Sequence, residues 1–264
     1  MAEISREKLV QALSTAVDPT FEKSLGDLGT LSDVSIEGGR ARAKVRVSTP
    51  SDQLKRTLGE ALEALAKEVG VGSLDIEWDV QIPTREATSE DPIPDVKNVV
   101  LVMSGKGGVG KSTTAANLAL ALRRQGTRVG LLDADIYGPS VPTMLGIQGH
   151  PMSKDGKRIQ PLERFGIKLM SIGFLLEDPT QAIVWRGPML HKAIRQFLED
   201  VAWGELDYLL IDLPPGTGDV TMTLAQMLPQ ARFLIVTTPQ PAAQKVAKRA
   251  AEAATRYDLE VVGI

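Results

Sequence analysis

The sequence lacks cysteine, has few aromatic residues and contains no long hydrophobic run. Without cysteine, its 264 residues can form no disulfide, no thiolate metal site and no cysteine nucleophile. Aromatic residues make up only 4% of the chain, which argues against the stacking platforms that hold nucleic-acid bases. No apolar run approaches the roughly 20 residues that span a bilayer, and residues 1–13 lack the apolar core of a signal peptide. We therefore expect a cytoplasmic protein that binds neither membrane nor nucleic acid.

The overall composition is that of an ordinary soluble protein. Apolar residues make up 43% and charged residues 24% of the chain, with a formal net charge of −3. This charge gives no general attraction to nucleic acid or to anionic lipid. The two histidines, His150 and His191, are far apart in the sequence, so we expect surface or packing roles for them rather than metal binding.

Residues 1–83 have the patterns of a small α-β-β-α-β domain. The expected elements are a helix around 9–17, a strand around 34–36, a strand over 40–47, a helix over 51–70 and a strand over 73–82. Ser51 is placed to cap the second helix and Gly70 to end it. The strands over 40–47 and 73–82 alternate polar and apolar residues, which is the period of a half-buried strand.

One face of the strand over 40–47 is strongly basic, with Arg40, Arg42, Lys44 and Arg46. A nucleic-acid surface would need a wider basic area and aromatic residues. The acidic side chains of 75–79 could supply opposite charges if the two strands were neighbours. We therefore interpret the basic face as a solvated surface.

The remainder of the chain changes pattern. We expect residues 84–97 to be a linker, because the stretch 83–98 holds four acidic residues and three prolines with no apolar period. From 98 to 264, short apolar runs bounded by turn residues alternate with helical patterns. This alternation predicts a doubly wound, mostly parallel α/β sheet whose ligand sits at the carboxyl ends of the strands.

The stretch MSGKGGVGKSTT, residues 103–114, lies between the first of these strands and a helix. Gly105, Gly110, Lys111 and Ser112 fit G-x-x-x-x-G-K-[ST], the pattern of the P-loop of NTPases. In such a loop, backbone N–H groups cradle phosphates, Lys111 would hold the outer phosphates, and Ser112 would bind Mg²⁺. The expected nucleotide contacts are Gly105, Lys106, Gly107, Gly108, Val109, Gly110, Lys111, Ser112, Thr113 and Gly216.

Aspartates end two other apolar strands. Asp133 and Asp135 follow one strand, and Asp212 ends another at DLPPGTGD. Carboxylates in these places are candidates for holding Mg²⁺ or for orienting the attacking water. Each alone fits a helix cap or a turn equally well, but their joint position beside a phosphate loop favours a functional role. The glycine-rich turn that contains Gly216 is suited to sensing the γ-phosphate through a backbone N–H.

The motifs together resemble a known family. GKGGVGKST is similar to the deviant phosphate loop of the MinD/ParA/nitrogenase-iron-protein group of ATPases. DADIYGPS, DLPPGTGD and the segment 183–190, IVWRGPML, resemble those of Mrp/ApbC-type iron–sulfur cluster carriers. The first domain is similar to the one that begins many bacterial members, including its DLG at 27–29. This resemblance implies an ATP-binding and hydrolysing carrier that transfers clusters to apoproteins and is gated by the nucleotide state of a homodimer.

The resemblance also implies a role for each site residue. Lys106 would cross the dimer interface to the partner's nucleotide. Asp135 would orient the attacking water, and Asp133 would support the first switch loop. Asp212 would reach Mg²⁺ through water, and Gly216 would sense the γ-phosphate. The expected catalytic residues are Lys106, Lys111 and Asp135, and the expected Mg²⁺ residues are Ser112, Asp133 and Asp212.

The chain departs from these carriers in its cluster ligands. Full-length carriers have a C-x-x-C pair after the last strand, where two subunits hold a [4Fe–4S] cluster. This chain stops at LEVVGI and has Asp52 where relatives often have a cysteine. We therefore expect a truncated chain, with the cluster only in the full-length protein and with iron–sulfur scaffolds and apoprotein acceptors as partners.

Two other functions stay open at this point. One is a nucleotide-gated scaffold with negligible turnover, because sequence does not fix the hydrolysis rate. The other is a MinD/ParA-type positioning ATPase, although no amphipathic basic tail is evident.

Overall fold

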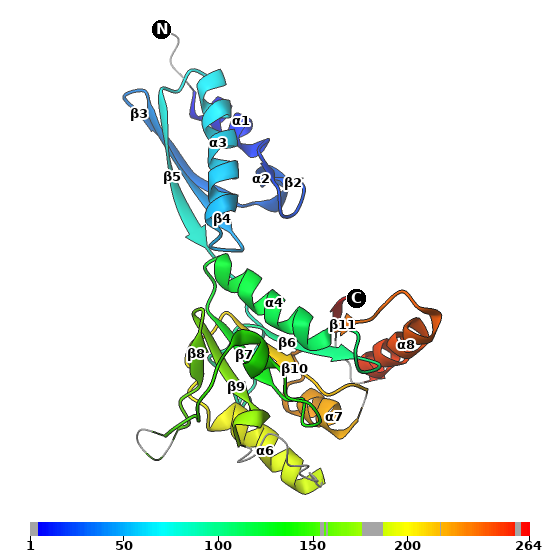
Figure 1. Ribbon diagram of the computed structural model, residues 1–264. Coiled ribbons are helices and arrows are strands. Elements are labelled where there is room, and N and C mark those ends of the chain that lie inside the picture. Colours follow the sequence, from blue (N-terminus) through cyan, green and yellow to red (C-terminus); the bar gives the residue numbers. More distant parts are fainter. Residues whose placement is uncertain (1–4, 154–155, 157, 176–186, 217, 257–259) are drawn as a thin grey trace. The chain divides into compact units, whose positions relative to one another are not determined.

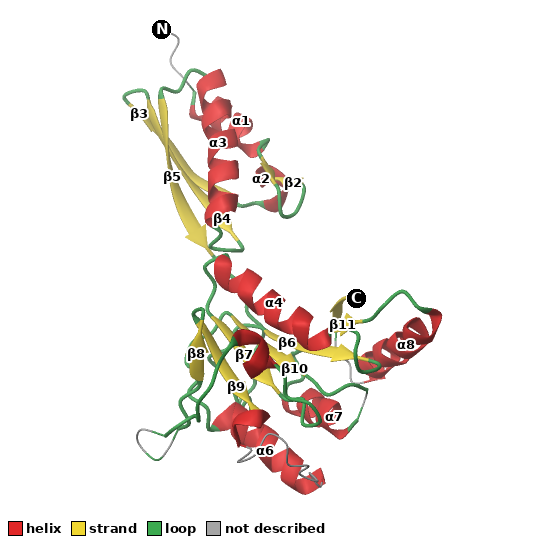
Figure 2. Ribbon diagram, viewed as in Figure 1, coloured by secondary structure: helices red, strands yellow, loops and turns green. Residues whose placement is uncertain are grey.

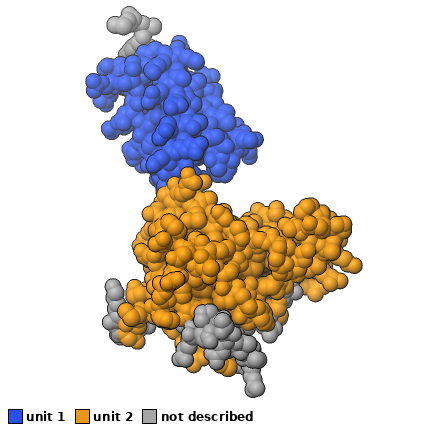
Figure 3. Space-filling model, in the orientation of Figure 1, with its two compact units in different colours: residues 1–83 blue, residues 84–264 orange. Residues whose placement is uncertain are grey.

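The computed structural model describes residues 5–153, 156, 158–175, 187–216, 218–256 and 260–264. The chain divides into two compact units, Met1–Pro83 and Thr84–Ile264 (Figure 3). Each unit has its own hydrophobic core, and each is described separately below.

The first unit is built around a three-stranded sheet (Figure 1). Its elements are α1 (Arg6–Ser14), β1 (Val17–Asp18), β2 (Lys23–Ser24), α2 (Leu25–Leu28), β3 (Leu31–Glu37), β4 (Arg40–Val47), α3 (Asp52–Glu68) and β5 (Ser73–Val80). The sheet order is β3-β4-β5, with β3 antiparallel and β5 parallel to β4. This confirms the expected α-β-β-α-β order and adds the small β1–β2 hairpin and α2. These extra elements are too short to show a period in the sequence.

Helix α3 packs its apolar stripe into the core of this unit, beside α1 (Figure 2). Leu54, Leu58 and Leu62 are almost fully buried. The Ser51 hydroxyl accepts a hydrogen bond from the Leu54 N–H at 3.4 Å, so Ser51 caps the helix as predicted. Gly70 follows the helix at φ +89°, a conformation that favours glycine.

The basic face of β4 is neutralised by the neighbouring strand. In the parallel β4–β5 register, three of the four basic residues stand opposite an acidic one, while Arg40 stands opposite Ser73. The ion pairs are Arg42–Asp75 at 3.3 Å, Lys44–Glu77 at 3.1 Å and Arg46–Asp79 at 3.4 Å. The interpretation of this face as a solvated, charge-paired surface is confirmed.

The second unit is a seven-stranded sheet with helices in the connections (Figures 1 and 2). Its elements are β6 (Val99–Ser104), α4 (Lys111–Arg124), β7 (Val129–Asp133), α5 (Val141–Leu145), β8 (Leu162–Arg164), β9 (Ile167–Ser171), the 3₁₀ helix η1 (Ile172–Leu175), α6 (Gly187–Glu199), β10 (Tyr208–Asp212), α7 (Asp219–Met227), β11 (Arg232–Val236), α8 (Pro241–Arg256) and β12 (Val261–Gly263). The strand order is β12-β11-β6-β10-β7-β9-β8, and only β8 is antiparallel to its neighbour. The predicted doubly wound, mostly parallel sheet is confirmed.

Residues 84–97, expected as a linker, fold against the second unit. Ile93 and Val96 are 4% and 2% exposed and belong to its core. Arg85 donates hydrogen bonds to the carbonyls of Val96 and Ile93 and forms a buried ion pair with Asp91. The prolines and acidic residues of this stretch favoured the interpretation as a linker. The structure shows instead that the buried Ile93 and Val96 attach it to the core of the second unit.

Candidate nucleotide-binding site

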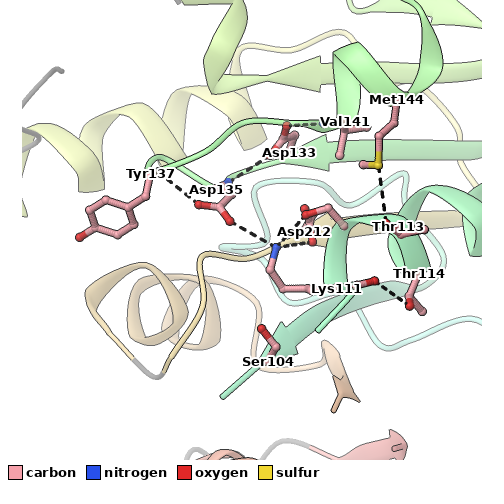
Figure 4. A network of polar contacts seen from close by, with 12 residues as sticks. Ser104, Lys111, Thr113, Thr114, Asp133, Asp135, Tyr137, Val141, Met144 and Asp212 are labelled. Atoms are coloured by element: carbon pink, nitrogen blue, oxygen red, sulfur yellow. Dashed lines mark hydrogen bonds and ion pairs between the residues drawn. The ribbon is translucent and has the colours of Figure 1, made fainter. Parts of the chain in front are cut away.

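The candidate site lies where β6, β10 and β7 end side by side. The loop 105–110 leaves β6 and leads directly into α4. In the parallel register Asp212 stands opposite both Val102 of β6 and Asp133 of β7. The two carboxylates that end neighbouring strands are therefore brought together beside the glycine-rich loop, as the motif pattern predicted (Figure 4).

Glycine is required at several points of this loop. Gly108 and Gly110 have φ values of +77° and +89°, which side chains other than glycine rarely adopt. Gly105 lies against α8, because a Cβ at this position would come within 2.4 Å of Val246 Cγ1. A Cβ on Gly107 would meet nothing within 4 Å, so there is open space on this side of the loop.

Lys111 points into a cluster of carboxylates (Figure 4). Its ammonium nitrogen donates to Asp212 Oδ1 at 2.6 Å and lies 3.5 Å from Asp135 Oδ2. It also lies 3.2 Å from Ser112 Oγ. The lysine side chain is 6% exposed. The buried Lys111 ammonium is thus paired with Asp212 and Asp135 at the position where the P-loop motif predicts phosphates.

Asp133 serves as an anchor for the loop that follows β7. It is fully buried, and both of its carboxylate oxygens accept hydrogen bonds from the protein. Oδ1 accepts from the Asp135 N–H at 3.2 Å. Oδ2 accepts from the Val141 N–H at 3.1 Å and from the Ser171 hydroxyl at 3.2 Å. This geometry favours its predicted loop-supporting role over direct binding of Mg²⁺.

The pKa of Asp133 is raised to about 7. The largest cause is burial, and the charge of Asp212 adds to it. The hydrogen bonds from Val141, Asp135 and Ser171 oppose the rise, since they stabilise the carboxylate form. Loss of any of these donors therefore favours protonation of Asp133.

Asp212 offers a ligand atom that the protein itself does not use. Among the described residues, its Oδ2 is a buried oxygen without a hydrogen-bond partner. Burial raises the pKa of Asp212, while Lys111 and the Ser112 hydroxyl lower it. An unused carboxylate oxygen beside a hydroxyl suits Mg²⁺, which prefers oxygen ligands. In the described part of the chain no three His, Cys, Asp or Glu side chains form a metal cluster, so phosphate and water oxygens would complete such a site.

The other predicted site residues surround this cluster. Asp135 is 8% exposed, and its Oδ1 accepts from the Tyr137 N–H at 3.2 Å. Thr113, at the start of α4, donates to Met144 Sδ at 3.8 Å. The Gly216 N–H donates to the carbonyl of Ser104, the last residue of β6, at 2.7 Å. Lys106 is exposed and Val109 is partly exposed on the loop.

Some of the predicted segments cannot be placed. Residues 183–186 of the segment 183–190, and Thr217 of DLPPGTGD, lie outside the described residues.

The sequence reasoning missed Ser171 and Ser104. Ser171 ends β9 directly opposite Asp133. Ser104 ends β6, and its hydroxyl donates to the Lys106 carbonyl at 3.0 Å within the glycine-rich loop. Both follow the rule that polar residues at strand ends face the ligand, but neither belongs to a motif with a known spacing.

Comparison with known proteins identifies related chains. Residues 95–264 match the ParA family described as NUBPL iron-transfer P-loop NTPases, and residues 6–73 match a family described as iron–sulfur cluster assembly proteins. An iron–sulfur cluster carrier protein of Synechocystis sp. is 42% identical over 99% of this chain and 75% of its own length. One from Deinococcus radiodurans is 45% identical over 98% of this chain and 73% of its own length.

A solved structure agrees with these matches. A nucleotide-binding protein from Archaeoglobus fulgidus, determined in complex with ADP, is 43% identical with a TM-score of 0.58. The match covers 68% of this chain and 71% of that one. The resemblance derived from the motifs is confirmed: the chain belongs to the ParA family of NUBPL-type iron-transfer P-loop NTPases.

Proposed function

We propose that this protein binds Mg·ATP at the Lys111 site, hydrolyses it slowly and, as a homodimer, delivers iron–sulfur clusters to apoproteins. The observation that carries the nucleotide part is the buried Lys111 ammonium, held between Asp212 and Asp135 at the start of α4. The related protein that was solved with ADP supports an adenine nucleotide. The cargo is inferred from the names of the two relatives.

Nucleotide binding would exchange the partners of Lys111. The polyanionic phosphates would attract its ammonium group away from Asp212, while N–H groups of 107–111 cradle the phosphate oxygens. Ser112 and Asp212 would then hold Mg²⁺, which neutralises charge on the phosphates. Before nucleotide binds, Lys111 would thus neutralise the charge of Asp212 that Mg²⁺ neutralises afterwards.

Hydrolysis requires a water molecule in line with the γ-phosphate. Asp135 would orient this water, which attacks the γ-phosphorus as the bond to the β–γ bridging oxygen breaks, giving ADP and inorganic phosphate. Lys106 would act from the partner subunit and neutralise charge that develops on the phosphoryl oxygens. Its exposed position on the loop is compatible with such a contact.

Cluster transfer needs ligands that these 264 residues do not supply. Thiolates are the usual ligands of iron–sulfur clusters, and the sequence contains no cysteine. A cluster carried as cargo would need thiolate ligands other than these 264 residues, and scaffold and acceptor proteins are its proposed partners. A cytoplasmic location is part of this proposal. None of the described helices is both long enough and apolar enough to cross a bilayer.

ATP turnover by matched variants tests the assignment of catalytic roles. We expect Lys111→Ala to lose nucleotide affinity and Asp135→Asn to bind ATP without turning it over. Lys106→Ala should retain binding and lose turnover, because only the cross-subunit contact is removed. Lys248→Ala, which removes an exposed cation of α8, is the control.

Three results would revise the proposal. Equal turnover in the wild type and all variants would remove the catalytic assignments. Loss of ATP binding in Lys106→Ala would contradict a role across the interface. Tight binding by the wild type with no turnover, even with an acceptor protein present, would favour the nucleotide-gated scaffold.

A further inference from the structure

Ser171 is a buried polar residue that no motif accounts for. It is the last residue of β9, is 0% exposed, and pairs in register with Asp133 of β7. It is followed directly by the 3₁₀ helix η1, which begins at Ile172. A serine in this position, rather than an apolar residue, indicates that its hydroxyl has a specific use.

The hydroxyl joins two elements that are far apart in sequence. It donates to Asp133 Oδ2 at 3.2 Å and accepts from the Gly173 N–H at 3.1 Å. A serine hydroxyl has one proton to donate and lone pairs to accept. Its proton is therefore committed to Asp133, while the acceptor side fixes the backbone of η1.

Through its other hydrogen bonds, Asp133 also holds the backbone near both ends of the loop 134–140. Its other contacts are the N–H groups of Asp135, near the start of the loop, and Val141, where α5 begins. The loop also packs directly on η1, because a Cβ on Gly173 would lie 3.1 Å from Pro139 Cβ. A continuous chain of contacts thus runs from η1 through Ser171 and Asp133 to the backbone of Asp135.

We propose that Ser171 is a positioning residue for Asp135: its hydroxyl ties η1 to Asp133 and so fixes the loop that carries the candidate catalytic carboxylate. This inference rests on the proposed ATPase function for its kinetic consequence. Its structural consequence, the ordering of the loop, does not depend on hydrolysis.

The contacts predict which kinetic constant changes. Among the described residues, neither Ser171 nor η1 forms a hydrogen bond or ion pair with the glycine-rich loop 105–110 or with Lys111. Lys111 keeps its 2.6 Å contact with Asp212 when the hydroxyl is removed, so we expect the groups that would bind phosphates to stay in place. The Asp135 carboxylate, in contrast, loses part of the support that orients it. An interaction needed only to place a reacting group lowers kcat and leaves KM nearly unchanged.

The test uses two substitutions at Ser171 and one control. Ser171→Ala removes the hydroxyl, and Ser171→Cys keeps nearly the same volume with a much weaker hydrogen-bond donor. Thr127→Val is the control, because Thr127 is also buried and its hydroxyl donates to the Leu122 carbonyl at 2.7 Å, near the opposite end of β7. The readouts are kcat and KM for ATP, and amide hydrogen exchange at Asp135 and Val141 in the nucleotide-free protein.

We expect both Ser171 variants to lose about tenfold in kcat, as is common when a supporting contact around a site is removed. Their KM should stay within about twofold of the wild type, and the Asp135 and Val141 amides should exchange faster. Thr127→Val should match the wild type in all of these measurements.

Two outcomes would overturn the proposal. Wild-type kcat and amide protection in Ser171→Cys would show that side-chain volume matters and the hydroxyl does not. An equal loss of kcat in Thr127→Val would show a general effect of losing a buried hydrogen bond. If the wild type itself shows no turnover, the ATPase proposal fails, and amide exchange alone still decides whether Ser171 orders the loop.

Discussion

The contacts of Lys111 explain why a buried cation is tolerated without a nucleotide. A lysine that is 6% exposed would be costly without a partner, and Asp212 at 2.6 Å provides one. The same pairing leaves Asp212 Oδ2 without a partner among the described residues. In the proposed mechanism, this carboxylate would pair with Lys111 before nucleotide binds and would be available to Mg²⁺ once phosphates take the lysine away.

Asp212→Asn should separate the effects of Mg²⁺ and nucleotide. The neutral amide binds Mg²⁺ poorly and no longer competes with phosphates for Lys111. We expect Mg²⁺ to improve ADP affinity about tenfold less in the variant than in the wild type, with tighter ADP binding in the absence of Mg²⁺. Titrations of ADP with and without Mg²⁺ measure both effects. An unchanged Mg²⁺ dependence would exclude Asp212 from the metal site.

At the residue scale, the sequence predicted which residue types gather at the site but not how they bond. Strand-end position and motif spacing identified Asp133, Asp135 and Asp212. Asp133 Oδ2 accepts hydrogen bonds from Ser171 and Val141, whereas Asp212 Oδ2 has no hydrogen-bond partner among the described residues. Those contacts arise from strand order and loop path, which no local pattern encodes.

Among the elements, the phosphate loop and α8 are in close contact. Gly105→Ala would place a methyl group 2.4 Å from Val246 Cγ1 and 2.8 Å from the Val246 carbonyl carbon, so the side chain alone cannot relieve the clash. We expect a destabilisation of about 1–3 kcal/mol, which is typical of overpacking. Thermal unfolding measures this change.

Gly107→Ala is the matched control for that substitution. Its Cβ would meet nothing within 4 Å, so the unfolding temperature should stay near that of the wild type. Equal destabilisation by the two substitutions would contradict the proposed contact between the loop and α8.

Asp207 joins the beginning of β10 to β7 and to the segment 84–97. Its carboxylate accepts from the Arg128 backbone N–H at 2.8 Å and pairs with Lys97 at 2.9 Å. Burial raises its pKa, but the hydrogen bonds from Arg128 and Lys97 outweigh burial and lower the pKa to about 2. This folded-state pKa lies below the ordinary value of 3.8, so the carboxylate stabilises the fold above about pH 4.

Asp207→Asn should therefore destabilise the second unit in a pH-dependent manner. We expect a loss of about 1–2 kcal/mol at pH 6, less than the full shift implies because Arg128 and Lys97 are partly exposed and screened. The difference from the wild type should shrink as the pH falls from about 4 through 2, because Asp207 becomes protonated first in the unfolded state and then, around its folded-state pKa of about 2, in the folded state. Urea unfolding followed by tryptophan fluorescence in a Trp78→Phe background measures it. A pH-independent difference would contradict the ionic origin.

The elements themselves were more predictable from sequence than their connections. Strong periods and caps identified α3 and the parallel strands correctly. Residues 84–97 were expected to be a linker, yet Ile93 and Val96 are buried in the core of the second unit. Two isolated apolar residues give no period, and their burial depends on distant parts of the chain such as Leu206 and the end of α6.

For the whole molecule, the separation into two units has a basis in the sequence. The first unit has its own core and a sheet in which three basic residues of β4 form ion pairs with acidic residues of β5. The second has the phosphate loop and all candidate nucleotide ligands. All residues of the proposed phosphate contacts therefore lie within 84–264.

Calorimetric titration of Mg·ADP into the wild type and Lys111→Ala tests the central claim most directly. The account predicts binding with one site per chain in the wild type. It also predicts affinity at least about tenfold lower in the variant, because a charge-assisted contact of roughly 1.5–3 kcal/mol is lost. Absence of binding heat at several temperatures in the wild type, or equal affinity in both proteins, would contradict the claim that Lys111 and its loop form a nucleotide site.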